Sequence, residues 1–328
     1  MNIKKQKSVD SKFLWVTLIL LFVGVTTFIS TSLGIYTEDK EMFFAMMTRH
    51  LGIGVIGGLA AMFVVSRIDY NFWKKLSPYI YILGIIITIL VFVPGLGFSH
   101  GGAQRWVSLG FISFQPAELL KFAVILFLSV WFARYEHEIK NWKKGLLAFL
   151  VIVGIAVIVL AKQPDSGTIA LIGAVGFIIY WLRGAPLKHI AIVAGLGVAF
   201  VSIYVAANPY IIERIKTYSD TNRDPYGSSY QIRQSKIAIG SGKIYGRGLG
   251  QSIQKFGPYL PESNSDSIFA IFAEEYGFIG GFILILLYSL FGFFGFKIAK
   301  RAPTVFAQNL VVGIILLVVL QVFFNIAA

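Results

Sequence analysis

Nine long apolar stretches are the feature of this chain that most constrains its fold. They cover roughly residues 13–35, 43–66, 77–96, 116–134, 145–162, 167–183, 188–207, 267–296 and 304–326. An apolar run of about 18 residues can cross a bilayer as a helix, and in lipid only helices and closed barrels satisfy every backbone hydrogen bond. These runs lack the alternation of a strand. The sequence therefore predicts an all-α polytopic membrane protein, with residues 1–328 forming a single integral membrane domain.

The composition agrees with a membrane domain and excludes several kinds of chemistry. Hydrophobic residues make up 56% of the chain and charged residues 14%, whereas a soluble domain carries about 25% charged residues. The absence of cysteine excludes disulfides, thiolate catalysis and iron–sulfur clusters. The four histidines lie far apart, so we expect no metal site built from protein nitrogen. The net charge of +13 suits anionic head groups or phosphate-bearing substrates, and nucleic acid is not expected as a partner.

Basic residues in the short connections predict the orientation. They fall in alternate connections: Arg67, Lys74 and Lys75; Arg134, Lys140, Lys143 and Lys144; Arg183 and Lys188; Lys297, Lys300 and Arg301. The positive-inside rule places these connections, and the lysine-rich N-terminus, in the cytoplasm. The first apolar run continues for about 20 residues without a clear cleavage site, which favours an uncleaved span over a signal peptide.

Two external connections are longer than the others, and they cover residues 99–115 and about 208–266. Long loops beside compact spans are commonly functional or disordered. The second loop contains several aromatic residues and ends in a dense motif, which favours function. The chain ends inside an apolar run at residues 325–328, so we expect a truncated C-terminus.

A pair of opposite charges opens the fourth apolar run. Glu118 and Lys121 are three residues apart, so on a helix they share a face and can form an ion pair. Ionisable groups within a membrane span usually face the protein interior or a water-filled cavity. The pair is therefore either a structural link to a neighbouring helix or part of a polar site.

Three further candidates lie in external turns and loops. Asp165 in the segment KQPDSGT is either a turn or helix N-cap residue, or a residue that shapes a site. Lys243 and Arg247 belong to a glycine-rich loop, residues 240–250, which is either a flexible hinge or a cradle for a diphosphate. The spacing of this loop does not match a nucleotide-binding P-loop.

Asp266 is the sharpest candidate, because it lies where the long external loop becomes a helix. One interpretation is an N-cap carboxylate favoured by the helix dipole. The other is a general base at the boundary between water and lipid. Glu274 lies eight residues further on, about 12 Å deeper at 1.5 Å per residue. We expect it to be a supporting or paired carboxylate.

Taken together, these segments resemble the SEDS family of shape, elongation, division and sporulation proteins. The matching stretches are GGAQRWVSLGFISFQPAELLKF, KQPDSGT, SSYQIRQSKIAIGSGKIYGRGLGQSIQKF and YLPESNSDSIFAIFAEEYGFIGG, in this order along the chain. Several long motifs in register are more specific than any one of them. The stretch GRGLGQSIQKF is more similar to FtsW-type division members than to RodA-type elongation members.

The resemblance implies a function and a set of residues. It implies ten spans, of which nine are found here, and polymerisation of lipid II into glycan strands, with release of polyprenyl diphosphate at the outer face of the cytoplasmic membrane during division. It implies a class B penicillin-binding protein and other divisome membrane proteins as partners, and a location at the septum. The family's catalytic aspartate corresponds to Asp266, its span-4 pair to Glu118 and Lys121, and its Pro-Asp-x-Gly-Thr aspartate to Asp165. Asn264 and Ser267 depart from the common His and Phe of the motif.

The mechanistic hypothesis is that a sugar hydroxyl of one lipid-linked disaccharide attacks the anomeric carbon of another, or of the growing glycan chain. Asp266 would accept the proton, and Arg105, Lys243 and Arg247, in that order, would stabilise the departing diphosphate. A divalent cation, Mg²⁺ or Mn²⁺, can share that work, although the sequence contains no visible ligand set. The alternatives are a flippase or transporter for the same lipid, an elongation-type polymerase, and a non-catalytic division scaffold.

Overall fold

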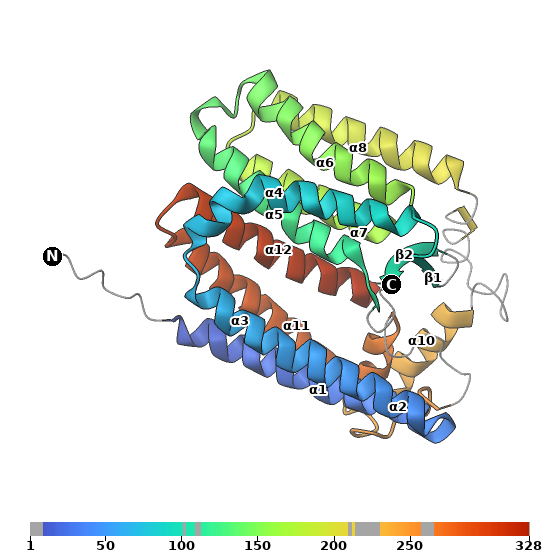
Figure 1. Cartoon of the computed structure of the whole chain (residues 1–328). Helices are drawn as coiled ribbons and strands as arrows, with labels where there is room; N and C mark the ends of the chain where they lie inside the picture. Colours follow the sequence, from blue (N-terminus) through green and yellow to red (C-terminus); the bar gives the residue numbers. More distant parts are fainter. Residues whose placement is uncertain are drawn as a thin grey trace. The chain divides into compact units, whose positions relative to one another are not determined.

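The computed structural model describes residues 9–100, 103–108, 113–208, 212–213, 230–256 and 266–327. Its ribbon is mainly helical (Figure 1). The α-helices are α1 (Ser11–Glu38), α2 (Lys40–Met47), α3 (Gly57–Arg67), α4 (Tyr70–Ile89), α5 (Pro116–Arg134), α6 (Ala148–Ala161), α7 (Ser166–Leu182), α8 (Leu187–Ala207), α10 (Tyr230–Ser241), α11 (Ile268–Lys300) and α12 (Val305–Ala327). Shorter helical elements are the π-helices η1 (Thr48–Ile56) and η4 (Trp142–Leu147), and the 3₁₀-helices η2 (Leu90–Phe92) and η3 (Glu136–Glu138).

The nine predicted spans all correspond to helices. Eight helical stretches in the described part of the chain are long and apolar enough to cross a membrane. They include Lys40–Arg67, where α2, η1 and α3 follow one another without a break. The ninth prediction corresponds to α7, an apolar helix of 17 residues, or about 25 Å at 1.5 Å per residue. The prediction of an all-α, multi-pass membrane protein is confirmed.

The predicted external loops contain ordered elements that the sequence did not indicate. A small antiparallel sheet with the order β1-β2-β3 occupies the first loop, and its strands are β1 (Gly97–His100), β2 (Ala103–Ser108) and β3 (Ser113–Phe114). Its register places Phe98 opposite Trp106. Strands of two to six residues are too short to reveal a period-two pattern. The second loop contains α10, a 12-residue helix.

The chain divides into two compact units, and the first to describe comprises Ile68–Phe200 and Gly295–Gln321. Its core forms where α5 packs against α4, α6 and α7. Helix α12 also approaches α5 and α7, because a Cβ atom added at Gly313 would lie 2.4 Å from Ile125 Cγ2 and 3.0 Å from Ile179 Cδ1. This glycine therefore allows a close helix contact.

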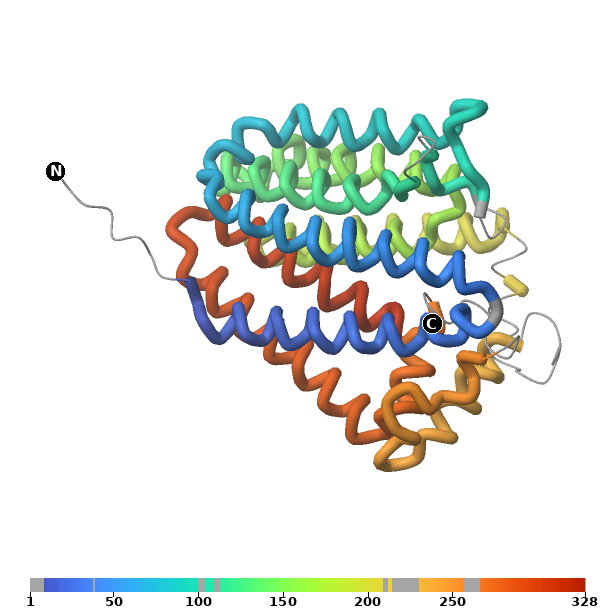
Figure 2. Tube along the Cα trace, turned by 60° about the horizontal axis from the view of Figure 1, so that its bottom comes forward, coloured from blue at the N-terminus to red at the C-terminus, as the bar shows by residue number. Residues whose placement is uncertain are grey.

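The other unit comprises Met1–Arg67, Val201–Phe294 and Val322–Ala328. Within it, α1 packs against α2, and the ring of Phe13 of α1 packs against that of Phe291 of α11 in a tilted arrangement, with ring centroids 5.0 Å apart. Towards its other end, α1 meets the segment that follows α10, since a Cβ atom added at Gly34 would lie 1.9 Å from the carbonyl oxygen of Lys255. Figure 2 traces this segment, coloured orange, beside the start of α11. That the whole chain acts as one membrane domain stays a prediction.

Candidate functional site

Asp266 lies in an exposed turn directly before α11. The carbonyl group of the next residue, Ser267, accepts hydrogen bonds from the N–H groups of Ala270 (3.0 Å) and Ile271 (3.4 Å), so the helix ladder begins there. The hydroxyl of Ser267 also accepts a hydrogen bond from Gln231 Nε2 of α10 at 3.1 Å. Ser267, rather than Asp266, therefore holds the N-cap position, and the Asp266 carboxylate is left exposed at the positive end of the helix.

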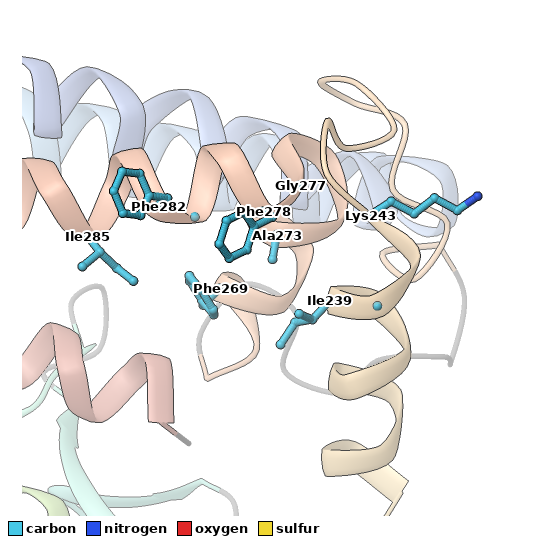
Figure 3. Close-up of a pocket in the computed structure, with 10 residues that line it drawn as sticks. Ile239, Lys243, Phe269, Ala273, Gly277, Phe278, Phe282 and Ile285 are labelled. Carbon is cyan, nitrogen blue, oxygen red and sulfur yellow. The ribbon is translucent and has the colours of Figure 1, made fainter.

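An apolar groove of about 390 Å³ lies between α10 and α11. It is lined by Ile239, Gly240, Lys243, Phe269, Ala273, Gly277, Phe278, Gly281, Phe282 and Ile285. Figure 3 shows Ile239 of α10 approaching Phe269 of α11, while the amine of Lys243 points away from the aromatic rings. Because Phe269 and Ala273 follow Asp266 by three and seven residues, this wall of the groove ends about one helical turn from the carboxylate.

Helix α11 is broken at Gly277, where the groove is formed. Gly277 has φ 66° and ψ −165°, a conformation that only glycine adopts readily. The break would leave two N–H groups without helical partners, and the loop after α10 supplies them. The N–H of Phe278 donates to the carbonyl of Lys243 at 2.9 Å, and that of Ile279 donates to the carbonyl of Ile244 at 3.1 Å.

The same loop also returns hydrogen bonds to the other side of the break. The N–H groups of Arg247 and Gly248 donate to the carbonyls of Glu274 and Glu275, each at 3.0 Å. We call this four-bond exchange the backbone clamp. Where a helix is broken within a membrane, its free backbone N–H and C=O groups need hydrogen-bond partners from the protein, and the clamp supplies them. The glycine-rich loop is therefore held against α11 by its backbone in this structure and is not a free hinge.

Glu274 is a buried, paired carboxylate. Its oxygens accept hydrogen bonds from Ser241 Oγ (3.1 Å), Ser252 Oγ (2.5 Å), Ile253 N (3.3 Å) and Gln254 N (3.4 Å). Arg247 forms an ion pair with it, with Nε 3.2 Å from Oε1. The Arg247 side chain remains 38% exposed, so part of its guanidinium group still faces outward. Lys243 is exposed.

The adjacent Glu275 belongs to a second buried cluster that sequence patterns did not reveal. Lys255 Nζ lies 2.8 Å from Glu275 Oε1, with side chains 0% and 1% exposed. The hydroxyl of Ser30, in α1, donates to the same carboxylate at 2.7 Å and accepts from Lys255 Nζ at 3.1 Å. The one sequence signal for this cluster was Glu275 itself, because a second carboxylate within an apolar run requires a charged or hydrogen-bonding partner.

Asp165 lies in the other unit, where it acts as the N-cap of α7. Its Oδ1 accepts a hydrogen bond from the N–H of Thr168 at 3.1 Å, and its Oδ2 accepts one from Gln115 Nε2 at 3.2 Å. The side chain is buried, with 6% of the residue exposed. Asp165 was interpreted as either a helix cap or a residue that shapes a site, and in this structure it is a helix cap.

Arg105, in β2, contacts the same turn. Its Nε donates to the carbonyl of Gln163 at 3.2 Å, and its guanidinium NH2 donates to the carbonyl of Pro164 at 2.5 Å. Two of its five donors are therefore occupied by backbone oxygens. The sequence did not predict these contacts with carbonyl groups, and Arg105 was our first candidate for binding the diphosphate.

Glu118 and Lys121 form an ion pair that links two helices of the same unit. Lys121 Nζ lies 2.9 Å from Glu118 Oε1, 2.8 Å from Oε2 and 2.9 Å from Gln321 Oε1 of α12. The Lys121 side chain is 2% exposed, whereas that of Glu118 is 47% exposed. The buried Lys121 ammonium group therefore needs Glu118 as its counter-ion, whereas the half-exposed Glu118 carboxylate can also be solvated by water. This geometry agrees with a structural link between the two helices.

We expect Glu118→Ala to destabilise the protein strongly, because it leaves the buried ammonium with a single neutral partner. Leaving one charge of a fully buried pair unpaired costs about 3–5 kcal/mol, and the loss here should be smaller because the Glu118 side chain is 47% exposed. Thermal unfolding of the purified protein in detergent measures the change. The double variant Glu118→Ala/Lys121→Met, which removes both charges, should unfold near the wild-type temperature. An unchanged melting temperature for Glu118→Ala would contradict the structural role.

The predicted residues therefore fall into two groups, one in each unit. Lys243, Arg247 and Glu274 take part in the clamp and share one unit with Asp266, whereas Arg105, Glu118, Lys121 and Asp165 lie in the other unit. Within the described ranges, no cluster of three or more His, Asp or Glu side chains is arranged to hold a metal ion.

A family model describes this arrangement of segments. The model FTSW_RODA_SPOVE, described as cell cycle protein, matches residues 11–328. The chain belongs to the FtsW/RodA/SpoVE family. The resemblance read from the four motifs is thereby confirmed for the family as a whole.

Individual relatives and solved structures agree with this family. Stage V sporulation protein E of Bacillus subtilis (strain 168) is 37% identical over 326 residues, which are 98% of this chain and 87% of the relative. Probable peptidoglycan glycosyltransferase FtsW of Coxiella burnetii (strain RSA 493 / Nine Mile phase I) is 34% identical over 97% of this chain and 86% of its own length. Members of both names thus align with the chain along most of its length.

Two solved structures share the fold of this family member. One is described as "Structural coordination of polymerization and crosslinking by a peptidoglycan synthase complex", and a chain in it has a TM-score of 0.76 at 23% identity, covering 98% of this chain and 87% of that one. The other is Rod shape determining protein RodA of Thermus thermophilus, with a TM-score of 0.60 at 20% identity over 94% and 83%. At these identities the likeness supports the fold.

Proposed function

We propose that this chain is a peptidoglycan glycosyltransferase that polymerises lipid II into glycan strands and releases polyprenyl diphosphate. The observation that carries the proposal is the exposed carboxylate of Asp266, three residues before Phe269 in the lining of an apolar groove, with the cations Lys243 and Arg247 on the loop after α10. The relatives named as probable peptidoglycan glycosyltransferases support the same chemistry.

The groove suits the lipid part of such a substrate. Apart from Lys243, its lining consists of aliphatic and aromatic side chains and glycine, which suits a polyprenyl chain without hydrogen-bonding groups. A prenyl segment in the groove would hold the attached diphosphate near the loop of residues 243–247. The sugar would then lie near the turn that carries Asp266.

The reaction follows from this placement. A sugar hydroxyl of the acceptor attacks the anomeric carbon of the donor, so a new C–O bond forms and the bond from that carbon to the diphosphate oxygen breaks. The electron pair leaves with the diphosphate, and the hydroxyl proton passes to the Asp266 carboxylate. A positioned base of this kind contributes about 10²–10⁴-fold. A single displacement inverts the anomeric configuration.

The departing diphosphate requires positive charge. Lys243 is exposed and Arg247 is partly exposed, so we assign this role chiefly to them. Two donors of Arg105 are bound to carbonyl groups, so we no longer assign it the leading role in binding the diphosphate. A Mg²⁺ or Mn²⁺ ion would be held mainly by the diphosphate oxygens of the substrate, where it would neutralise charge.

The site faces the outside of the cell in this proposal. The basic residues Lys297 and Lys300 lie in the last turn of α11, opposite the end that begins after Asp266, and the positive-inside rule assigns that basic end to the cytoplasm. The N-terminus is then cytoplasmic. We also propose action at the division septum with a class B penicillin-binding transpeptidase and other divisome proteins. The FtsW-named relatives support division, and RodA-type elongation is the alternative.

A proteoliposome experiment tests the activity and separates it from its rivals. The purified protein, with and without a class B penicillin-binding protein, is incubated with lipid II, and glycan polymer and lipid translocation are measured in parallel. We expect polymer to accumulate, and protein-free liposomes provide the baseline. Translocation without polymer would favour a flippase. The absence of both would favour a non-catalytic scaffold, and either outcome would overturn the proposal.

A further inference from the structure

We propose that Glu275 and Lys255 are positioning residues for Asp266. Their buried ion pair, together with Ser30, anchors the segment before the Gly277 break to α1, and so fixes the direction of the helical residues 268–276 that follow Asp266. This inference rests on the proposed function, in which Asp266 is the base.

The first step is that residues 268–276 do not take their direction from the rest of α11. The non-helical conformation of Gly277 interrupts the helix at that point. A piece of nine residues is too short to be a stable helix on its own, since isolated helices below about 12–15 residues are marginal. Its orientation, and therefore that of Asp266, must come from contacts with other elements.

The second step is that the contacts converge on the end of this piece. Glu275 accepts hydrogen bonds from Ser30, from Lys255 and from the N–H of Ser252 at 3.4 Å. Ser30 belongs to α1, a 28-residue helix, which offers a long and stable support. Lys255 and Ser252 belong to the segment that continues from the backbone clamp. One carboxylate thus connects three parts of the chain.

The third step is that this pair cannot act on the substrate directly. Both side chains are at most 1% exposed, so neither reaches a bound sugar or diphosphate. A buried ion pair contributes little net stability compared with apolar side chains of similar size, but it requires a particular geometry. We therefore expect the two charges to contribute more to the orientation of residues 268–276 than to the free energy of unfolding.

A distance measurement tests the inference without any need for activity. The chain has no cysteine, so spin labels can be attached at Asp266→Cys and at Phe293→Cys, a position 62% exposed beyond the break in α11. Double electron–electron resonance then reports the distribution of distances between the labels. We expect a narrow distribution in the otherwise wild-type protein, and a broadened or shifted one after Lys255→Met.

Two further variants make the result decisive. Lys255→Met leaves a buried carboxylate without its cation and can prevent folding, so Glu275→Gln/Lys255→Met, which removes both charges, is measured as well. Lys144→Met is the matched control, because it breaks the pair with Glu138, in which both side chains are more than 40% exposed. The control should leave the distance distribution unchanged. An unchanged distribution in the folded double variant would overturn the inference.

Kinetics with Asp266 intact give the second readout. In the double variant we expect turnover to fall about 10- to 100-fold, as misplacement of a catalytic group by about 1 Å does, while KM for lipid II stays within about threefold. Lys144→Met should retain wild-type turnover. Turnover of the double variant within twofold of wild type would also overturn the inference. Failure of the wild-type protein to make polymer would instead overturn the proposed function.

Discussion

Asp266→Asn is expected to lower glycan polymerisation by about 10²–10⁴-fold, the contribution of a positioned general base. Asparagine has nearly the same size as aspartate but cannot accept the proton of the attacking hydroxyl. Because Asp266 is exposed in a turn and does not cap α11, the substitution should change the free energy of unfolding by no more than about 0.5 kcal/mol. The loss should therefore appear in activity alone.

The measurement is glycan product formed from lipid II by equal amounts of folded protein. Glu41→Gln is the matched control, because Glu41 is another exposed carboxylate near the start of a helix in the same unit. It should retain wild-type activity. If Asp266→Asn polymerises lipid II within a few-fold of wild type, Asp266 is not the base.

Gly277→Ala is expected to disrupt the backbone clamp and to abolish activity. A side chain at φ 66° is strained by about 1–3 kcal/mol. The added Cβ atom would also lie 2.3 Å from the backbone N of Gly246 and 2.6 Å from the carbonyl oxygen of Ile244, and such overpacking costs about 1–3 kcal/mol more. The melting temperature should fall, and the loop after α10 should separate from α11.

Gly281→Ala provides the comparison for this variant, since it lies four residues further along the same helix. A Cβ atom there would have one neighbour within 4 Å, Phe269 Cζ at 3.9 Å. Alanine favours a helix over glycine by up to about 1 kcal/mol, so this control should unfold at or above the wild-type temperature. Equal melting temperatures for the two variants would mean that the clamp does not depend on Gly277.

The helices could be predicted from the sequence because lipid leaves the backbone so few choices. The run predicted at 116–134 coincides with α5 (Pro116–Arg134), and that at 13–35 lies within α1 (Ser11–Glu38). The break inside the predicted span 267–296 was not predictable, because a glycine at a break looks the same in sequence as one inside a helix. The three-stranded sheet and α10 were hidden in polar, glycine-rich segments that are too short for periodicity.

The candidate site could be predicted where the signal is local. The position of Asp266 at a boundary between loop and helix, and the pairing of Glu118 with Lys121 three residues away, both follow from spacing. The partners of Glu275 do not, because Lys255 is 20 residues away and Ser30 is 245 residues away. The contacts of Arg105 likewise reach 58 and 59 residues along the chain. Only the folded chain brings such groups together.

The reciprocal hydrogen bonds across Gly277 also limit how this protein can be re-engineered. Four backbone hydrogen bonds join residues 243–248 to residues 274–279, so adding or deleting one residue within either stretch would move donors of the clamp away from their acceptors. A chimaera that receives the loop of a relative would therefore need the adjoining piece of helix from the same source. The two stretches, although about thirty positions apart, therefore constrain each other's length and have to be exchanged together.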